Sequence, residues 1–302
     1  MRLTATRASV TSGGGVAITA LPDFTYGITS AGGVFNLRSA GTVNYDVEWG
    51  DGDAETSTLN TLPHTYVAGS YSLLVNSSGV YRPYFNNVTA DANQITSVAI
   101  GPGANLGTDL LNAWYGASNM TSFVCAFDVT SGVTSFNSAW RGCSNLATFP
   151  LIDTSSGTDF SGMFFNCTGL TNIPSIDTSN GTDFDNFCKR TAITTFSALD
   201  FSSSTRFLDA WYDCSSLADF PANMFDTTGT LISNAFRQSW SICALTAQSI
   251  ENILVSLDTN GASNITLAIS GGTNAGKTTW SAAAVTAYDN LIAKGWTISF
   301  NS

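Results

Sequence analysis

The sequence predicts a mixed fold of three parts: an all-β sandwich, a solenoid of stacked α/β repeats, and a cap of helices and strands. Three observations predict it. Self-similar segments recur with a period near 24 residues, alternating apolar and polar residues with turn signals precede them, and helix and strand patterns follow them. The expected division is an N-terminal arm at 1–21, a sandwich at 22–90, about six repeats at 91–245 and a cap at 246–302.

Each repeat contains an aromatic residue that is followed six positions later by Leu, Ile or Met. Neighbouring aromatic positions are separated by 26, 24, 23, 24 and 25 residues. A unit of one short strand and one short helical or irregular turn cannot bury its apolar side alone, so stacking should place these residues in one buried ladder. The expected ladder consists of Trp114, Trp140, Phe164, Phe187, Trp211 and Phe236.

Other positions repeat in step with the aromatic residues. Aspartates recur just before Ser/Thr-rich turns, at Asp153, Asp177 and Asp200, where their carboxylates can accept backbone N–H bonds. An apolar column comes three or four positions before each aromatic residue and consists of Leu110, Phe136, Phe160, Phe184, Phe207 and Ile232. These columns are expected to be structural.

The segment from Phe149 to Leu170, FPLIDTSSGTDFSGMFFNCTGL, resembles the BspA-type leucine-rich repeats of bacterial surface proteins, which also occur in phage proteins. The resemblance covers roughly residues 95–300 and implies a leucine-rich-repeat α/β solenoid that presents a binding surface. The fourth copy departs from the pattern at Cys188-Lys189-Arg190, so that repeat is expected to be irregular.

Three of the six cysteines, Cys143, Cys167 and Cys214, come three residues after an aromatic residue of the ladder. An even number of cysteines is compatible with disulfides, but a column at the repeat period favours small, buried, free thiols. A zinc site is not expected, because the chain has no Cys-x-x-Cys pair and its single histidine is far away in the sequence.

The cap is expected to contain helices at 247–257 and 281–293 and strands at 265–269 and 296–300. Between them, Gly271-Gly-Thr-Asn-Ala-Gly-Lys-Thr278 matches the pattern of a phosphate-binding loop. Only 24 residues follow Thr278, and the sequence around the motif is not expected to supply the parallel sheet and Mg²⁺-binding aspartate of a nucleotide hydrolase. A structural glycine-rich connection is therefore the preferred interpretation.

Before the repeats, Trp49-Gly-Asp-Gly52 is followed by His64-Thr-Tyr66 and Gly69-Ser-Tyr71. This arrangement is similar to the PKD domain, and the resemblance implies an immunoglobulin-like β-sandwich. Asp51 and Asp53 could bind Ca²⁺ together with backbone oxygens, although stabilisation of the turn is the commoner role of such residues. His64 is expected to be a structural strand residue, and no cofactor other than this possible Ca²⁺ is expected.

Composition narrows the class of function. Only 11% of the residues are charged and the net charge is −11, which disfavours contact with nucleic acid. The sequence has no apolar stretch long enough for a membrane span, and its first residues do not look like a signal peptide. No nucleophile with a base and no metal or carboxylate pair stands out, so the protein is expected not to be an enzyme.

Two functions remain open. The first is a phage virion protein exposed on the particle, such as a tail fibre, host-recognition or head decoration protein. It would contact other virion proteins through the arm or sandwich and a host glycan or protein through the repeats, without membrane insertion, either as a monomer or as a homo-oligomer. The second is a bacterial cell-surface adhesin. The candidate ligand surface, formed by residues that follow the ladder, consists of Tyr115, Arg141, Phe165, Tyr212 and Arg237.

Overall fold

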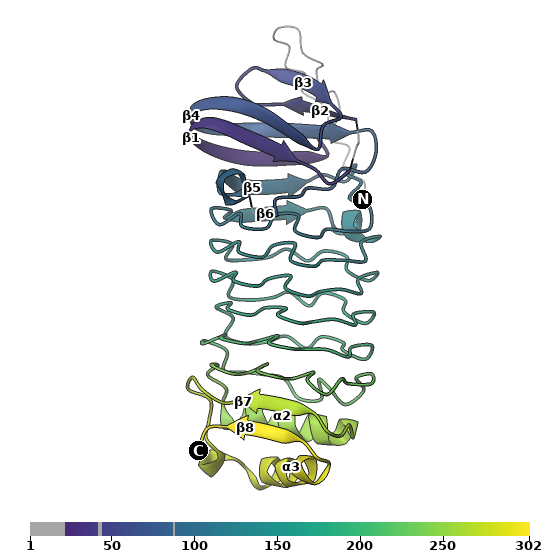
Figure 1. Ribbon diagram of the computed structural model, residues 1–302, viewed down its shortest axis with the longest axis vertical. Helices are drawn as coiled ribbons and strands as arrows, with labels where there is room; N and C mark the ends of the chain where they lie inside the picture. The colour runs from purple at the N-terminus through teal and green to yellow at the C-terminus, as the bar shows by residue number, and fades with distance from the viewer. Residues whose placement is uncertain (1–21, 42–43, 87) are drawn as a thin grey trace, which may run out of the picture.

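The computed structural model describes residues 22–41, 44–86 and 88–302. The molecule is elongated, with a β-sheet at one end, a stack of coils in the middle and a small unit of helices and strands at the other end (Figure 1). The predicted N-terminal arm lies outside the described residues. No helix of the described residues is long and apolar enough to cross a membrane.

The sheet is built around two long strands, β1 (Phe24–Arg38) and β4 (Thr61–Ser77). They pair antiparallel, from Phe24 opposite Val75 to Arg38 opposite Thr61. β2 (Tyr45–Glu48) pairs with the free edge of β4, and β3 (Ala54–Ser57) pairs with β2. On the other side, β1 pairs with β5 (Ile95–Ile100), which pairs in parallel with β6 (Ser122–Cys125) of the first coils.

The predicted immunoglobulin-like sandwich is wrong, because these strands form one mixed sheet in the order β3-β2-β4-β1-β5-β6 and not two facing sheets. One face of the sheet is covered by the segment after β4. There the ring of Tyr81 lies 4.8 Å from that of Phe24, and the ring of Phe85 lies 6.4 Å from that of Phe35. Alternating residues predict that strands form, but they do not specify whether the strands share a sheet.

The repeats form irregular coils joined by backbone hydrogen bonds in a constant register. The N–H of Trp114 donates to the carbonyl of Ala139, that of Trp140 to Met163, that of Phe164 to Phe187, that of Cys188 to Ala210 and that of Trp211 to Ser239. Beyond the β5–β6 pair, successive coils meet through single parallel bridges, such as Ser135 with Asp159 and Asp159 with Asp183. The same positions therefore lie above one another along the stack.

The predicted leucine-rich-repeat α/β solenoid is wrong. Within the described chain, no α-helix lies between the one-turn α1 (Thr89–Ala92) and α2 (Ala247–Asn260), and the only helical segment between them is the 3₁₀ turn η1 (Phe127–Thr130). The regular sheet also ends at β6. The coils therefore contain turns and bends where the repeat pattern predicted strands and helices.

Left-handed backbone positions explain why no helix forms in the coils. Each of the six coils has one such residue two positions before the column of Trp114 and another two positions after it, with φ between 54° and 79°. The first set is Asn112, Ser138, Gly162, Asn186, Asp209 and Gln238, and the second is Gly116, Gly142, Asn166, Arg190, Asp213 and Ile242. Most of these are Gly, Asn or Asp, the residues that adopt this conformation at least cost. A right-handed helix cannot continue through them.

The backbone register corrects the predicted ladder in two coils. Trp114, Trp140, Phe164 and Trp211 share a column, but the hydrogen-bond pattern continues it through Cys188 and Trp240 instead of Phe187 and Phe236. Phe187 is still buried and packs edge-on against Phe184 at 5.4 Å. The sequence period misplaced the column in these two coils because the sixth coil is longer and because Phe187 immediately precedes Cys188, the residue that occupies the column.

Phe236 belongs instead to the column that precedes the ladder. Its ring stacks on Phe207 at 5.1 Å, and the column continues through Phe184, Phe160 and Phe136 with ring separations of 5.1 to 5.7 Å. Ile232, which was predicted to occupy this position, is 39% exposed. The aromatic core is thus continuous over the coils from Phe136 to Phe236.

The predicted elements of the cap are confirmed. They are α2, β7 (Thr266–Ile269), α3 (Ala282–Ala293) and β8 (Thr297–Phe300), with the 3₁₀ turn η2 (Lys277–Thr279) before α3. The side chains of Thr246 and Ser281 cap the two helices by accepting N–H bonds from Ser249 and Ala284. The N–H of Trp240 in the last coil donates to the carbonyl of Ala268 in β7, so the cap continues the hydrogen bonding of the stack.

We predict that Ile242→Asn raises the free energy of unfolding by about 1 kcal/mol, because a β-branched residue is strained in the left-handed conformation. Ile242 has φ 62° and is 37% exposed, so little packing is lost. Urea denaturation measures the change. The reverse substitution at the equivalent position, Asn166→Ile, should lower the stability by a similar amount. A loss of stability in Ile242→Asn would contradict this account.

Candidate functional site

The residues that follow the buried column form a second, outward column in which aromatic and cationic side chains alternate. It consists of Tyr115, Arg141, Phe165, Lys189 and Tyr212, and we call it the aromatic–cation column. Cζ of Arg141 lies 5.3 Å from the ring centre of Tyr115 and 4.2 Å from that of Phe165. Nζ of Lys189 lies 5.4 Å from the ring centre of Phe165 and 4.7 Å from that of Tyr212. All five side chains are partly exposed.

Four of the five residues predicted for the ligand surface lie in this column. Arg237 does not, because the register places Ser241 after Trp240 at the equivalent position of the sixth coil. Lys189 was missed, because the ladder prediction placed Phe187 in the column position that Cys188 occupies. The departure from the repeat pattern at Cys188-Lys189-Arg190 was the signal that could have revealed it.

The cations of this region differ in how they are neutralised. Nζ of Lys189 lies 2.7 Å from Oδ2 of Asp209, and Nε of Arg190 lies 3.2 Å from Oδ2 of Asp213. Arg141 forms no ion pair within the described residues, and its guanidinium lies against the two aromatic rings. A hollow of about 380 Å³ opens beside it, lined by Thr89, Asn93, Tyr115, Gly116, Ser118, Arg141, Gly142, Phe165, Asn166 and Arg190.

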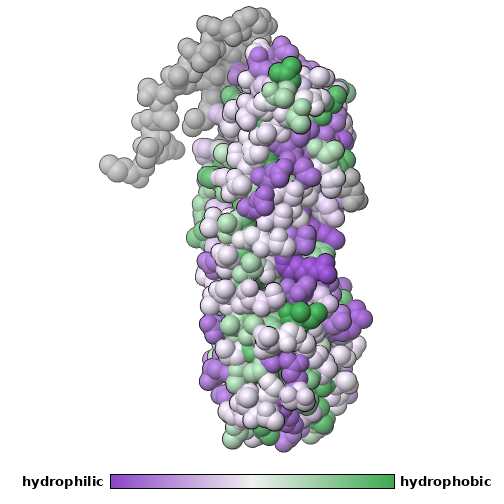
Figure 2. All heavy atoms as spheres, turned by 90° about the vertical axis from the view of Figure 1, so that its left-hand side faces the viewer, coloured by the Kyte–Doolittle hydropathy of each residue, from purple (hydrophilic) through white to green (hydrophobic). Residues whose placement is uncertain are grey.

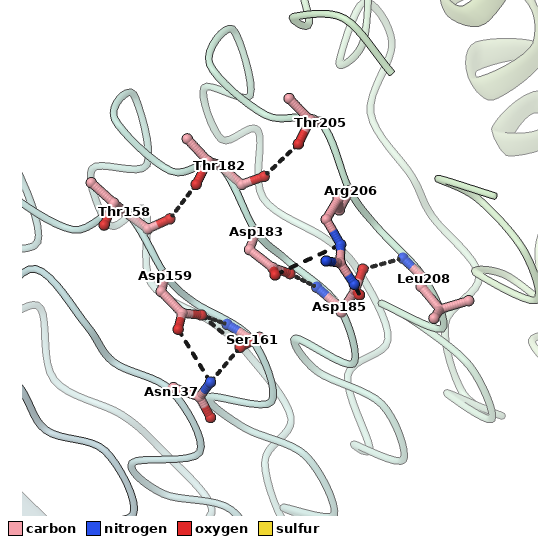
Figure 3. A network of polar contacts seen from close by, with 10 residues as sticks. All are labelled: Asn137, Thr158, Asp159, Ser161, Thr182, Asp183, Asp185, Thr205, Arg206 and Leu208. Carbon is pink, nitrogen blue, oxygen red and sulfur yellow. Dashed lines mark hydrogen bonds and ion pairs between the residues drawn. The ribbon is translucent and has the colours of Figure 1, made fainter. Parts of the chain in front are cut away.

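A network of Thr, Asp, Asn and Ser side chains runs along another column of the coils (Figure 3). The hydroxyls of Thr158, Thr182 and Thr205 each donate to the threonine carbonyl of the preceding coil at 3.1 to 3.3 Å. Asp159 accepts hydrogen bonds from Asn137 and Ser161. These contacts tie neighbouring coils together, so the network has a structural explanation.

One arginine forms ion pairs with two carboxylates of the same network. Arg206 pairs with Asp185, and its Nε lies 3.7 Å from Oδ2 of Asp183. Burial, together with the nearby carboxylates of Asp185 and Asp159, raises the pKa of Asp183 above its usual value despite Arg206.

The recurring aspartates act as predicted. Asp153, Asp177 and Asp200 each accept the backbone N–H of the serine two residues later, at 3.0, 3.0 and 2.8 Å. These bonds stabilise turns and leave the three carboxylates without a further partner of opposite charge in the described structure.

The candidate Ca²⁺ ligands Asp51 and Asp53 lie next to His64, and one possible ligand atom from each residue falls within 4.8 Å of the others. Asp51 is already engaged, because Oδ1 accepts the N–H of Asp53 at 3.2 Å and Oδ2 lies 2.7 Å from Nε2 of His64. His64 also stacks on the ring of Trp49 at 4.4 Å. Although burial acts to raise it, these hydrogen bonds lower the pKa of Asp51 below its usual value.

An imidazole nitrogen is a poor ligand for Ca²⁺, which prefers oxygen. We therefore expect millimolar Ca²⁺ to leave the melting temperature unchanged, as read by differential scanning calorimetry. Asp53→Asn provides the matched control: a Ca²⁺-induced rise in melting temperature that disappears in this variant would establish Asp51 and Asp53 as a calcium site.

All six cysteines are buried and free. Four of their thiols donate to a backbone carbonyl of the preceding coil: Cys143 to Trp114 at 3.3 Å, Cys167 to Trp140 at 3.0 Å, Cys214 to Cys188 at 3.1 Å and Cys243 to Trp211 at 3.1 Å. The thiols thus act as weak hydrogen-bond donors inside the stack. Burial raises the pKa of Cys167 to about 12.

The segment that matches a phosphate-binding loop has no free cradle. Nζ of Lys277 lies 3.7 Å from the ring centre of Tyr288, and the N–H of Gly271 donates to Asn301 Oδ1 at 2.8 Å. The buried side chain of Asn274 donates to the carbonyls of Trp240 and Ile269. The residues after Gly276 form the short η2 and not the helix whose N-terminus would hold a phosphate. These contacts support the structural interpretation of the loop.

Comparisons with protein-family models, with curated proteins and with solved structures find no match to this chain. Only 11% of the residues are charged, and on the face shown in Figure 2 residues of intermediate hydropathy predominate. The aromatic–cation column is the most distinctive feature of the surface, because its rings and cations contact one another over five successive coils.

We predict that the six thiols of the native protein react very slowly with a disulfide reagent at pH 8 and that all six react after denaturation. Burial raises the pKa of the five thiols other than Cys214 above that of an unfolded thiol, so the stability that these five contribute should be lost as the pH rises above about 9. Absorbance of the released thiolate counts the reacted groups. Rapid reaction of several thiols in the native state would contradict the burial described here.

Proposed function

We propose that this protein is a non-enzymatic binding protein whose ligand contacts the aromatic–cation column. The observation that carries the proposal is the alternation of rings and cations over Tyr115, Arg141, Phe165, Lys189 and Tyr212. Exposed aromatic and arginine side chains are enriched where proteins bind partners, and their mutual stacking fixes them before a ligand arrives.

The histidine and the cysteines, which could act as a base or a nucleophile, are held in structural contacts. The single histidine, His64, is stacked on Trp49 and bonded to Asp51. The cysteines are buried, and burial holds the pKa of Cys125 at about 12, far above the range in which thiolates form at neutral pH. These contacts support a binding function over catalysis.

We further propose that the protein is exposed on the surface of a phage particle, as a tail fibre, host-recognition or head decoration protein. The resemblance of the repeat segments to those of phage and bacterial surface proteins supports this location. In that arrangement the end with β1–β4 would attach to other virion proteins, and the stack would hold the column away from the particle. A bacterial cell-surface adhesin would use the same column.

The role of the aromatic–cation column in binding is tested with one variant that replaces the rings at its two ends, Tyr115→Ser and Tyr212→Ser. Both side chains lie on the outside of the stack, so the melting temperature should change little and attachment to host cells should fall at least tenfold. Leu151→Ser removes an exposed apolar side chain, 52% accessible, outside the column and serves as the matched control. Unchanged attachment of a folded double variant would contradict the proposed function.

The location is tested separately by proteomics of purified particles. Presence of the chain in particles supports the virion proposal. Its absence from particles together with its presence in a bacterial surface fraction would support the adhesin instead.

A further inference from the structure

Arg141 has an unusual environment for an arginine on a chain with a net charge of −11. Its guanidinium lies between the rings of Tyr115 and Phe165, and within the described residues it contacts no carboxylate. Contact with two rings limits the movement of the guanidinium, and no carboxylate of the described residues pairs with its N–H groups. A planar fork of this kind matches the two oxygens of a carboxylate in a bidentate contact.

The hollow beside Arg141 has a lining that suits a sugar. Its side chains include the amides of Asn93 and Asn166 and the hydroxyls of Thr89 and Ser118, and none of its lining residues is acidic. Arg190 adds a second cation. The hollow measures about 380 Å³, at the lower end of the range of about 300–1,000 Å³ for small-molecule sites, which suits one sugar unit of a longer chain.

We propose that this hollow binds an acidic sugar unit of a glycan, with the sugar carboxylate held by Arg141 and the sugar hydroxyls facing the amide and hydroxyl side chains. The inference rests on the proposed binding function and adds the class of ligand. Arg141 is the anchor, because its charge is uncompensated whereas Arg190 is paired with Asp213 at 3.2 Å.

The charge of the whole molecule favours this ligand over more highly charged ones. A net charge of −11 repels polyanions, and the repulsion grows with the charge density of the ligand. A glycan with one carboxylate per sugar unit has a lower charge density than a sulfated polymer or a nucleic acid. Its hydroxyl groups also use the uncharged polar lining, for which a peptide of acidic residues offers fewer partners.

The probe is an oligomer of galacturonic acid, and its methyl ester is the matched neutral ligand with the same rings. Isothermal titration calorimetry with the full chain should show binding of the acid and at least tenfold weaker binding of the ester. Arg141→Gln should weaken binding of the acid at least tenfold. Arg141→Lys, which keeps the charge and the contact with the rings but loses the planar fork, should give an intermediate loss.

Arg237→Gln is the control, because Arg237 is exposed and also lacks an ion pair in the described structure but lies outside the aromatic–cation column. It should bind the oligomer as the unsubstituted protein does. A melting curve of each variant separates a loss of binding from a loss of folding. Dextran sulfate and poly-glutamate extend the comparison to a sulfated glycan and an acidic peptide.

Several results would overturn the proposal: no binding of the acid oligomer, equal binding of acid and ester, unchanged binding in Arg141→Gln, or binding of poly-glutamate or dextran sulfate as tight as that of the oligomer. These results would leave the proposed function intact if the Tyr115→Ser, Tyr212→Ser variant still loses attachment to cells. Normal attachment of that variant would instead remove the proposed function itself.

Discussion

Every coil of the stack depends on its pair of left-handed backbone positions, which hold the turn between them in a fixed shape. In the first such turn, the N–H groups of Asn112, Trp114 and Gly116 donate to carbonyls of the next coil, at 2.7 to 3.0 Å. The N–H groups of Ala113 and Tyr115 bond back within their own turn. The backbone groups are thus satisfied without a helix or a regular sheet, as buried backbone requires.

The same alternation directs the side chains. Trp114 points into the stack and is completely buried, whereas Tyr115, one residue later, lies on the outside. The core and the aromatic–cation column are therefore two sides of one turn, repeated coil by coil. The arrangement has a cost, because the indole N–H groups of Trp140, Trp211 and Trp240 are buried without a hydrogen-bond partner among the described residues. A lost hydrogen bond costs about 1–3 kcal/mol, and the burial and stacking of the large rings offset it.

The sequence predicts those features that depend on local pattern and on equal spacing. The cap elements agree with the structure because their helices have apolar periodicity and capping residues such as Thr246 and Ser281. The Asx turns at Asp153 and its equivalents are local as well. The left-handed positions were not recognised, although Asn, Asp and Gly occur at most of them. Without them, the same period was interpreted as strand and helix.

The spacing of residues along the sequence could not predict which distant strands and coils pair with one another. Nothing local distinguishes a sandwich from the single sheet in which β1 and β5 join the N-terminal strands to the coils. At the site, the repeat period correctly placed Tyr115, Arg141, Phe165 and Tyr212 in one column, because the coils that carry them are nearly equal in length. Lys189 and Arg237 were misjudged because Cys188 and Trp240 hold the positions that the two phenylalanines were expected to hold.

The hydrogen bonds between coils also set how the molecule would respond to force. The coils stack along the long axis, with the sheet and the cap at opposite ends (Figure 1). Tension between the two ends acts along these bonds and loads every coil junction in series, so the weakest junction would open first. Each released coil of about 24 residues would lengthen the tether by up to about 80 Å. A stack of this kind is stiff at rest and would extend in discrete steps under load, one for each coil that opens.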